Sequence, residues 1–242
     1  MTKYETLRRT QSWYGESIGI LILDAAYPCV PGNVGNATTF PFPVRYQEVR
    51  GASLDRLITR ADPSLAEPFV EAAVELRDRG VKAITGACGF MALFQREVAA
   101  AIDIPVFLSS LMQVQFIYAI TGRPVGIITA NAARLTTRHY EAIGVASTIP
   151  IVIGDMYAKR EFREAILEEK GTLDSDQIEQ EAVEVAMDLK CRNVGAILLE
   201  CSDLPPYAHA IQAATNLPVF DFITMINYVQ AAILPRRYTG AM

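Results

Sequence analysis

The chain has 242 residues, of which 51% are hydrophobic and 20% are charged, with 22 basic against 27 acidic side chains. This composition is typical of a globular protein, and a formal charge of -5 without a basic cluster excludes nucleic acid as the main partner. The longest apolar runs are too short to span a bilayer and the first residues carry no apolar signal-peptide core, so we expect no membrane association and a cytoplasmic location.

The first part of the chain alternates short apolar runs with helical patterns. The run SIGILIL is almost wholly apolar, as expected for a parallel strand that is buried on both faces. Proline-rich sequence follows, and it favours a long loop. In chain order we expect a strand at 17–23, a loop at 28–50, a helix at 67–79, a strand at 81–85, a helix at 90–102 and a strand at 104–108.

The same alternation continues after Arg123-Pro124. We expect a strand at 125–129, a helix that begins at Asn131 and is capped by it, a strand at 149–153, helices at 161–169 and 176–190, a strand at 194–199, a helix at 205–214 and a strand at 217–220. Regular alternation of strands and helices predicts an α/β fold with mainly parallel sheets and helices outside them.

The two halves of the chain resemble each other. The segment that begins at Gly80 aligns without gaps on the one that begins at Asn193, an offset of 113 residues (193 − 80). In this alignment Cys88 matches Cys201, and each cysteine follows a predicted strand, where open α/β sheets place ligands. We therefore expect two pseudo-twofold related lobes with the active site in the cleft between them. The N-terminal lobe would hold 17–122 and 221–242, and the C-terminal lobe 123–220.

Recognisable cofactor and metal motifs are absent from the sequence. There is no Walker A sequence, GxGxxG, CxxC or HExxH, and only two histidines are available. We expect neither a cofactor nor a metal. Four cysteines in a chain of this length are not a disulfide framework, so each thiol is either buried filler or functional. Cys29 and Cys191 lack the symmetry of the matched pair, and we expect them to be structural.

Two thiols that face each other can move a proton without a cofactor. A thiolate is a competent base, and a helix N-terminus is expected to lower the thiol pKa below its usual value of about 8.5. One of the two, Cys88 or Cys201, would remove a proton from a bound carbon acid, and the other would return a proton to the opposite face. The structural alternative is that both thiols are buried apolar side chains.

The motifs GACGF and LECSDLP, together with the repeat and the length, resemble the aspartate/glutamate/hydantoin racemase superfamily over nearly the whole chain. The resemblance implies a two-lobe fold, cofactor-independent acid/base cysteines and a homodimer or higher homo-oligomer. Where the amino-acid racemases have Gly-Cys-Thr followed by Glu or His, this chain has Cys201-Ser202-Asp203. Ser202 would then contact the substrate carboxylate, and Asp203 would support the thiol.

The first motif departs from the family pattern. Amino-acid racemases have Cys-Asn-Thr there, whereas this chain has Cys88-Gly89-Phe90. Gly89 and Phe90 would face the substrate without the usual polar contacts. This change disfavours glutamate and aspartate, and Phe90 favours a bulkier or more apolar ligand.

Further candidates come from the ends of other predicted strands and from the long loop. Asp24 ends the first strand, where family members carry a carboxylate that assists the first thiol; a surface turn is the alternative. Thr38 and Thr39 could replace the missing hydroxyls if the loop at 28–50 is a lid. Ser109 is a candidate substrate contact or the start of a turn, and Asn131 a helix cap or a ligand contact.

Three functions remain open from the sequence. The first is a racemase or isomerase of a small carboxylate or amino-acid-like carbon acid, in which Cys88 and Cys201 exchange acid and base roles. The second is a β-elimination lyase on the same scaffold, of the dimethylsulfoniopropionate lyase type that releases acrylate. The third is a metabolite-binding protein without catalysis. The superfamily shares one cleft but differs in chemistry, so the fold alone does not decide among them.

Overall fold

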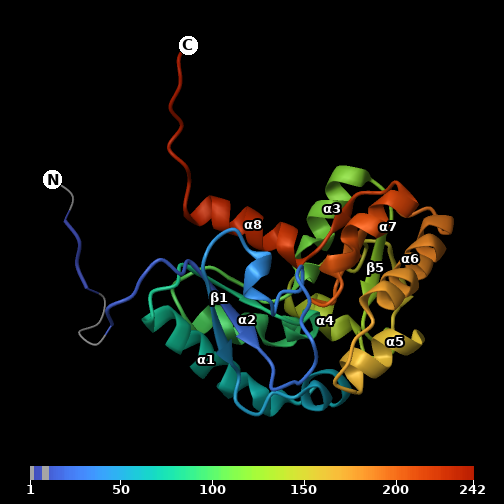
Figure 1. Cartoon of the computed structure of the whole chain (residues 1–242), viewed down its shortest axis with the longest axis horizontal. Helices are drawn as coiled ribbons and strands as arrows, with labels where there is room; N and C mark the ends of the chain where they lie inside the picture. The colour runs from blue at the N-terminus through green and yellow to red at the C-terminus, as the bar shows by residue number, and fades with distance from the viewer. Residues whose placement is uncertain (1–2, 7–10) are drawn as a thin grey trace.

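The computed structural model describes residues 3–6 and 11–242 and contains two four-stranded sheets whose strands are all parallel (Figure 1). The sheets have the orders β2-β1-β3-β4 and β6-β5-β7-β8, so each half of the chain builds one sheet in the same way. This arrangement confirms the predicted α/β class with two pseudo-equivalent lobes.

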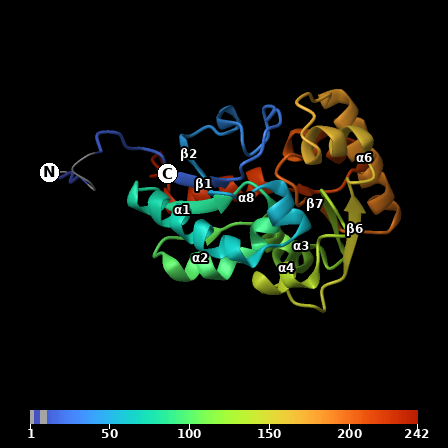
Figure 2. The same cartoon turned by 90° about the horizontal axis from the view of Figure 1, so that it is seen from below.

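The first sheet forms because its central strands are apolar on both faces. Its strands are β1 (Ile18–Ile22), β2 (Val44–Glu48), β3 (Ala83–Gly86) and β4 (Val106–Phe107). Helices α1 (Ala66–Asp78) and α2 (Gln95–Ala101) lie on one side of β1, and the loop before β2 lies on the other (Figure 2). Gly19 lets α1 approach closely, since a Cβ there would lie 2.8 Å from Leu76 Cδ1.

The second sheet repeats this plan with β5 (Val125–Thr129), β6 (Ile151–Asp155), β7 (Ala196–Leu199) and β8 (Val219–Phe220). Its helices are α4 (Thr137–Ala142), α5 (Arg160–Phe162), α6 (Ser175–Cys191) and α7 (Ala208–Thr215). Helix α6 begins where Asp174 accepts a hydrogen bond from the Gln177 N–H, and its buried face packs against β5 and β6.

Two helices cross between the lobes. Helix α3 (Val114–Thr121) follows the first sheet in the chain but packs against β5 and β7 of the second. Helix α8 (Phe222–Ile233) follows the second sheet but packs against β3, and its Phe222, Met225 and Ile226 join Ile18 and Ile20 in one buried cluster. The lobes therefore exchange equivalent helices.

Short helical turns connect the larger elements. Five are 3-10 turns, η1 (Ala37–Thr39), η3 (Pro63–Leu65), η4 (Gly89–Phe94), η5 (Ser110–Gln113) and η7 (Pro205–Tyr207). Two are π-helical turns, η2 (Asp55–Thr59) and η6 (Arg163–Leu167), which stand at equivalent places after β2 and β6. π-Helical turns are rare in proteins, and those that occur are often found at functional sites.

Several expected elements differ from the structure. The segment 28–50 is not one loop, because β2 pairs with β1 as an edge strand; its sequence VRYQE is half-exposed and lacks a buried apolar run. No helix begins at Asn131, since α4 starts at Thr137 and is capped by Thr136. The helix expected at 90–102 is divided into η4 and α2, and α3 and α8 were not predicted as helices.

In the part of the chain that the structure describes, no helix has the length and apolar character needed to cross a membrane.

Candidate active site

The two matched cysteines line one buried cavity between the lobes. Cys88 lies two residues beyond the end of β3, and Cys201 two residues beyond the end of β7. The carboxyl ends of both sheets therefore face the same space, which is where parallel α/β sheets bind ligands. The cavity is also lined by the side chains of Glu200 and Asp203, and both thiols are free.

Hydrogen bonds join the lobes beside the thiols. Ser202 Oγ donates to the Ala87 carbonyl at 2.6 Å, and Ser110 Oγ donates to the Leu199 carbonyl at 3.0 Å. The Val34 N–H donates to the Ser202 carbonyl at 3.3 Å. Because the Ser202 hydroxyl proton is engaged by Ala87, it is not available to the substrate carboxylate in this conformation, contrary to the role that the resemblance implied.

Asp203 is the hydrogen-bonding partner of the Cys201 thiol. Cys201 Sγ donates to Asp203 Oδ2 at 3.2 Å, and Asn33 Nδ2 donates to Oδ1 at 2.6 Å. The Tyr27 hydroxyl lies 3.5 Å from Oδ2, at the limit of a hydrogen bond. Burial raises the pKa of Asp203, and these hydrogen bonds oppose the rise. A carboxylate with a raised pKa is a better acceptor for the thiol proton.

The thiols do not have the lowered pKa values expected from helix N-termini. Burial raises the pKa of Cys88 well above its usual value, and the negative charge of Glu200 raises it further. N–H groups of Phe90 and Met91 oppose this only in part. Burial raises the pKa of Cys201 in the same way, and the negative charge of Asp203 raises it further. Desolvation therefore outweighs the backbone dipoles, and both groups rest as thiols.

Glu200 is a site residue that the sequence analysis missed. Its side chain is 0% exposed, and Oε2 accepts a hydrogen bond from Thr129 Oγ1 at 2.8 Å. Oε1 has no hydrogen-bond partner among residues 3–6 and 11–242. Burial raises the pKa of Glu200 to about 7. The sequence contained a signal for Glu200, because a carboxyl that directly follows a buried apolar strand and precedes Cys201 is expected to be buried.

Gly89 and Phe90 shape the cavity on the Cys88 side. A Cβ at Gly89 would lie 2.0 Å from Glu200 Oε1, so only glycine fits beside this carboxyl. Phe90 lines the cavity and meets the His139 ring edge-on, with the ring centroids 5.1 Å apart. Phe90 thus forms an apolar wall of the cavity, whereas Gly89 makes room for Glu200.

Besides Gly89, which touches Glu200 but is not a lining residue, five predicted residues do not line this cavity. Asp24 is exposed, and its backbone N–H donates to the Ala52 carbonyl. Thr38 and Thr39 use their hydroxyls inside the loop, on Asn36 Oδ1 and on the Asn33 carbonyl.

Ser109 and Asn131 are also engaged elsewhere. Ser109 is buried and caps η5 by accepting from the Leu111 N–H, and Asn131 is half-buried in a turn that is closed by the Arg134 N–H. The two remaining cysteines lie outside the cavity: Cys29 is half-buried, with its pKa raised by burial to about 11, and Cys191 is exposed.

The cavity is closed in this conformation. Its volume is about 10 Å³, which holds about one water molecule and excludes a substrate. Leu54 just before the first π turn, Ile58 within it, and Ile166 and Leu167 from the second π turn form apolar walls, so we expect ligand entry to involve movement of these turns. None of the described residues that line the cavity is Lys, Arg or His, and the described residues contain no cluster that could hold a metal ion.

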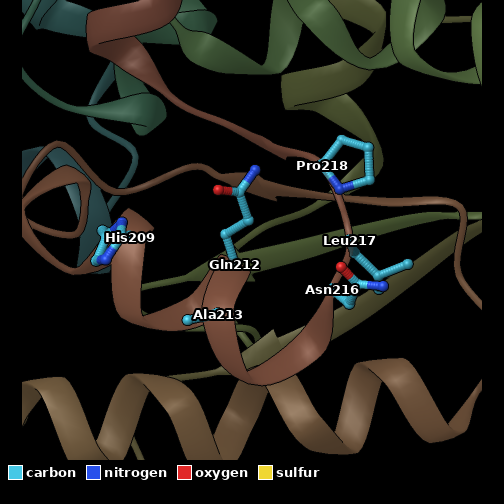
Figure 3. Close-up of a pocket in the computed structure, with 6 residues that line it drawn as sticks. All are labelled: His209, Gln212, Ala213, Asn216, Leu217 and Pro218. Carbon is cyan, nitrogen blue, oxygen red and sulfur yellow. The ribbon is translucent and has the colours of Figure 1, made fainter.

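A wider surface hollow of about 520 Å³ lies at the other end of the second sheet (Figure 3). It is lined by His209, Gln212 and Ala213 of α7 and by Asn216, Leu217 and Pro218, which precede β8. Neither a thiol nor a carboxylate lines it, and the amino ends of parallel strands are not their usual ligand edge. The closed cavity is therefore the better candidate for catalysis.

Known proteins resemble the chain in sequence and in fold. The model of the Asp/Glu/hydantoin racemase family matches residues 60–226. "Dimethylsulfoniopropionate lyase 3" of Emiliania huxleyi (strain CCMP1516) is 32% identical in an alignment of 235 positions that covers 90% of this chain and 60% of the relative. The "Dimethylsulfoniopropionate lyase" of Durusdinium sp. clade D is 30% identical in an alignment of 223 positions that covers 88% of this chain and 73% of the relative.

A solved structure shows the same fold at low identity. The aspartate racemase of Picrophilus torridus superposes with a TM-score of 0.58 at 15% identity and covers 92% of this chain and 96% of its own. The chain spans about 60% of the length of the first Emiliania relative, so only part of that protein is represented. With two parallel four-stranded lobes and a family model that matches most of its length, the chain belongs to the Asp/Glu/hydantoin racemase family.

Proposed function

We propose that this protein is a cofactor-independent β-elimination lyase that acts on a small carboxylate with a cationic leaving group, of which dimethylsulfoniopropionate is the first to test. The observation that carries the proposal is the unequal surroundings of the two thiols. Cys201 is hydrogen-bonded to Asp203, and Glu200 precedes it. With the 113-residue offset, the residues equivalent to Asp203 and Glu200 in the first half are Phe90 and Ala87.

Racemisation and elimination make different demands on the two thiols. A two-base racemase works in both directions, so each thiol must serve as base for one enantiomer. Elimination needs one base. Asp203 can take the proton of Cys201 and leave a desolvated thiolate, which is a strong base because burial raises its pKa. Cys88 has no comparable acceptor in its own motif.

The electron balance of the reaction is simple. The Cys201 thiolate takes the proton on the carbon next to the substrate carboxylate, and the C–H electron pair becomes the carbon–carbon double bond. The bond from the β-carbon to the sulfonium sulfur breaks, and its electron pair stays on sulfur, which leaves as a neutral thioether. The products are an unsaturated carboxylate and the thioether. The substrate proton is then on Cys201 and the former thiol proton is on Asp203, from which it leaves to solvent before the next turnover.

The cavity walls suit a sulfonium group. Tyr27 and Phe90 present aromatic rings, which attract cations, and Leu23 and Ile58 offer apolar contacts to methyl groups. Before it takes the thiol proton, Asp203 adds negative charge on the same side as Tyr27. The lack of Lys, Arg and His among the lining residues removes any repulsion of a cationic leaving group. Both named lyase relatives act on a sulfonium compound by their names.

A proton NMR time course in D2O tests the proposal. The full chain is mixed separately with dimethylsulfoniopropionate, aspartate, glutamate, hydantoins and maleate. New vinyl signals with dimethylsulfoniopropionate are the expected result. Loss of an α-proton signal from an amino acid or a hydantoin, with an intact carbon skeleton and no vinyl signal from any compound, would overturn elimination in favour of racemisation.

Racemisation remains the second candidate, because both thiols line one cavity. The two functions separate in the variant Cys88→Ala, since inversion needs two opposed groups and must disappear. A lyase loses less, because Cys201 and Asp203 are both retained. Stereoinversion measured by circular dichroism, beside alkene release, distinguishes these outcomes.

A binding protein without catalysis is the third candidate. Its thiols would have no functional reason for perturbed pKa values. The pH dependence of alkylation, followed by mass spectrometry, should show that Cys88 and Cys201 react only above the usual thiol pKa of about 8.5. Ordinary titration of these two thiols would support the binding protein.

A further inference from the structure

The carboxyl of Glu200 lines the same cavity as the two thiols, and its two oxygen atoms have different surroundings. Oε2 accepts from Thr129 Oγ1 at 2.8 Å, and the backbone N–H of Ala130 also hydrogen-bonds to the carboxyl. Oε1 is buried and has no partner in the described residues. It lies against Gly89, where a side chain would collide with it. The glycine at position 89 therefore provides the space that this oxygen occupies.

The surroundings of Glu200 favour its neutral form. Burial raises its pKa to about 7, and no cation lines the cavity to hold it ionised. A donor already occupies Oε2, so in the neutral acid the proton belongs on Oε1. That O–H group would have no acceptor among the described residues and would be available to a ligand.

Other side-chain donors around the cavity are already engaged. The Ser202 hydroxyl donates to the Ala87 carbonyl, and the Cys201 thiol donates to Asp203. The Tyr27 hydroxyl is directed at Asp203 as well. Apart from the Cys88 thiol, Glu200 is the lining side chain whose donor is uncommitted.

We propose that Glu200 is a catalytic residue that acts as a neutral acid and donates a hydrogen bond from Oε1 to the substrate carboxylate. Glu200 has this role only within the proposed function, because it requires a carboxylate substrate. When the α-proton leaves, negative charge builds on the carboxylate oxygens. A preorganised donor stabilises that charge more in the transition state than in the bound substrate.

The charged and titratable groups that face Glu200 come from three places. Cys88 lies after β3, Cys201 and Asp203 lie after β7, and Tyr140 comes from α4. Burial raises the pKa values of both thiols and of Tyr140. Asp203 also has a raised pKa, so the variant Asp203→Asn must accompany any pH titration.

The matched pair Glu200→Gln and Glu200→Met tests the role of the donor. Gln keeps the shape and offers an N–H donor at the position of Oε1, whereas Met has similar size and no donor. With dimethylsulfoniopropionate we expect kcat of Glu200→Gln within about tenfold of the native protein and a loss of about 100-fold in Glu200→Met. Glu181→Gln is the control, because Glu181 is buried against the Glu161 and Phe162 N–H groups and lies outside the cavity. Equal kcat values for Gln and Met would overturn the inference.

Binding of propionate gives a readout that needs no turnover. Its affinity for the native protein, measured by calorimetry, should fall about tenfold per pH unit above about pH 7, because the ionised carboxylate cannot donate. In Glu200→Gln the affinity should not depend on pH in this range. An affinity that is independent of pH in the native protein would overturn the inference.

Infrared spectra provide an independent check of the neutral acid. The carbonyl band of a protonated carboxylic acid should disappear as the pH rises through about 7, and Glu200→Gln should lack this change while Asp203→Asn and Glu181→Gln retain it. If no compound is cleaved but the propionate and infrared results hold, the lyase proposal fails and Glu200 stands as a carboxylate-binding acid. If the lyase reaction occurs but Gln and Met behave alike, the Glu200 inference fails alone.

Discussion

Cys201 and Asp203 form the one thiol–carboxylate hydrogen bond in the cavity, at 3.2 Å. In the proposed reaction this pair generates the base, so the effect on kcat of substituting either member should differ from the effect of substituting Cys88. We expect Cys201→Ala to lower kcat by about 10⁴-fold and Asp203→Asn by about 100-fold, since Asn keeps the shape but accepts no proton. Steady-state alkene release measures both.

Cys191→Ala is the matched control for these substitutions, because Cys191 is exposed on α6 and lies outside the cavity. It should leave kcat unchanged. An equal loss in Cys88→Ala and Cys201→Ala would mean that the thiols are interchangeable and would favour racemisation.

Glu200 predicts how stability depends on pH. Its pKa is about 7 in the folded protein, against an ordinary value of 4.5, so between these values the native state retains a proton that the unfolded chain has lost. The free energy of unfolding should therefore be highest below about pH 4.5 and fall as the pH rises through about 7, by about 3 kcal/mol for this group.

Urea unfolding of the native protein and Glu200→Gln at about pH 5 and about pH 8 isolates this effect from other groups. Gln cannot ionise, so its stability relative to the native protein should increase between the two values. A constant difference between the two proteins would show that Glu200 does not titrate in this range.

At the scale of elements, the two π turns behave as a symmetric pair. They lie 108 residues apart (163 − 55), and each is followed by a non-glycine residue with positive φ, Ala61 at 46° and Glu169 at 51°. Their side chains Ile58 and Ile166 close the cavity from opposite lobes. The Ala26 N–H donates to Glu169 Oε1 at 2.5 Å and joins the loop after β1 to the second π turn.

We expect Glu169→Ala to favour opening of the cavity, because it removes this hydrogen bond between the lobes. Alkylation of Cys88 and Cys201 should become about three- to tenfold faster, by the loss of about 1 kcal/mol of hydrogen bonding. Mass spectrometry of the labelled thiols measures it. Glu168→Ala is the control, since Glu168 pairs with Arg163 at the same turn. The same acceleration in both variants would contradict the role of the hydrogen bond between Ala26 and Glu169 in keeping the cavity closed.

At the scale of the molecule, the exchanged helices predict one cooperative unit. Because α3 packs on the second sheet and α8 on the first, neither lobe can unfold without exposing core of the other. Phe162 is fully buried in the second lobe, and Phe162→Ala should cost about 3–5 kcal/mol. Trp13 is the single tryptophan and lies beside Arg45 and Arg79 of the first lobe.

The unfolding transitions followed by Trp13 fluorescence and by far-ultraviolet circular dichroism should therefore shift together in Phe162→Ala, although the substitution is in the other lobe. Met187→Ala on exposed α6 should change stability by less than about 0.5 kcal/mol. A Trp13 transition that stays at the native midpoint would mean that the lobes unfold separately. The homodimer implied by the resemblance stays a prediction, and sedimentation velocity of the full chain tests it.

Much of the fold could be predicted because parallel strands and amphipathic helices have local periodicity. The predicted strand at 125–129 coincides with β5, and α6 lies within one residue of its predicted ends. The failures have equally local causes. Strand β2 is a half-exposed edge, and the Asn131 segment forms a turn before Thr136 supplies the cap.

By itself the sequence determined the duplicated α/β architecture and the place of Cys88 and Cys201, because strand ends and repeats are properties of chain order. Only the tertiary structure decided which polar groups surround the thiols. It placed Asp24, Thr38 and Thr39 elsewhere, brought Asn33 to Asp203, and buried Glu200 beside Gly89. It also reversed the expected direction of the thiol pKa shifts, because desolvation depends on the atoms packed around a group and not on its neighbours in the chain.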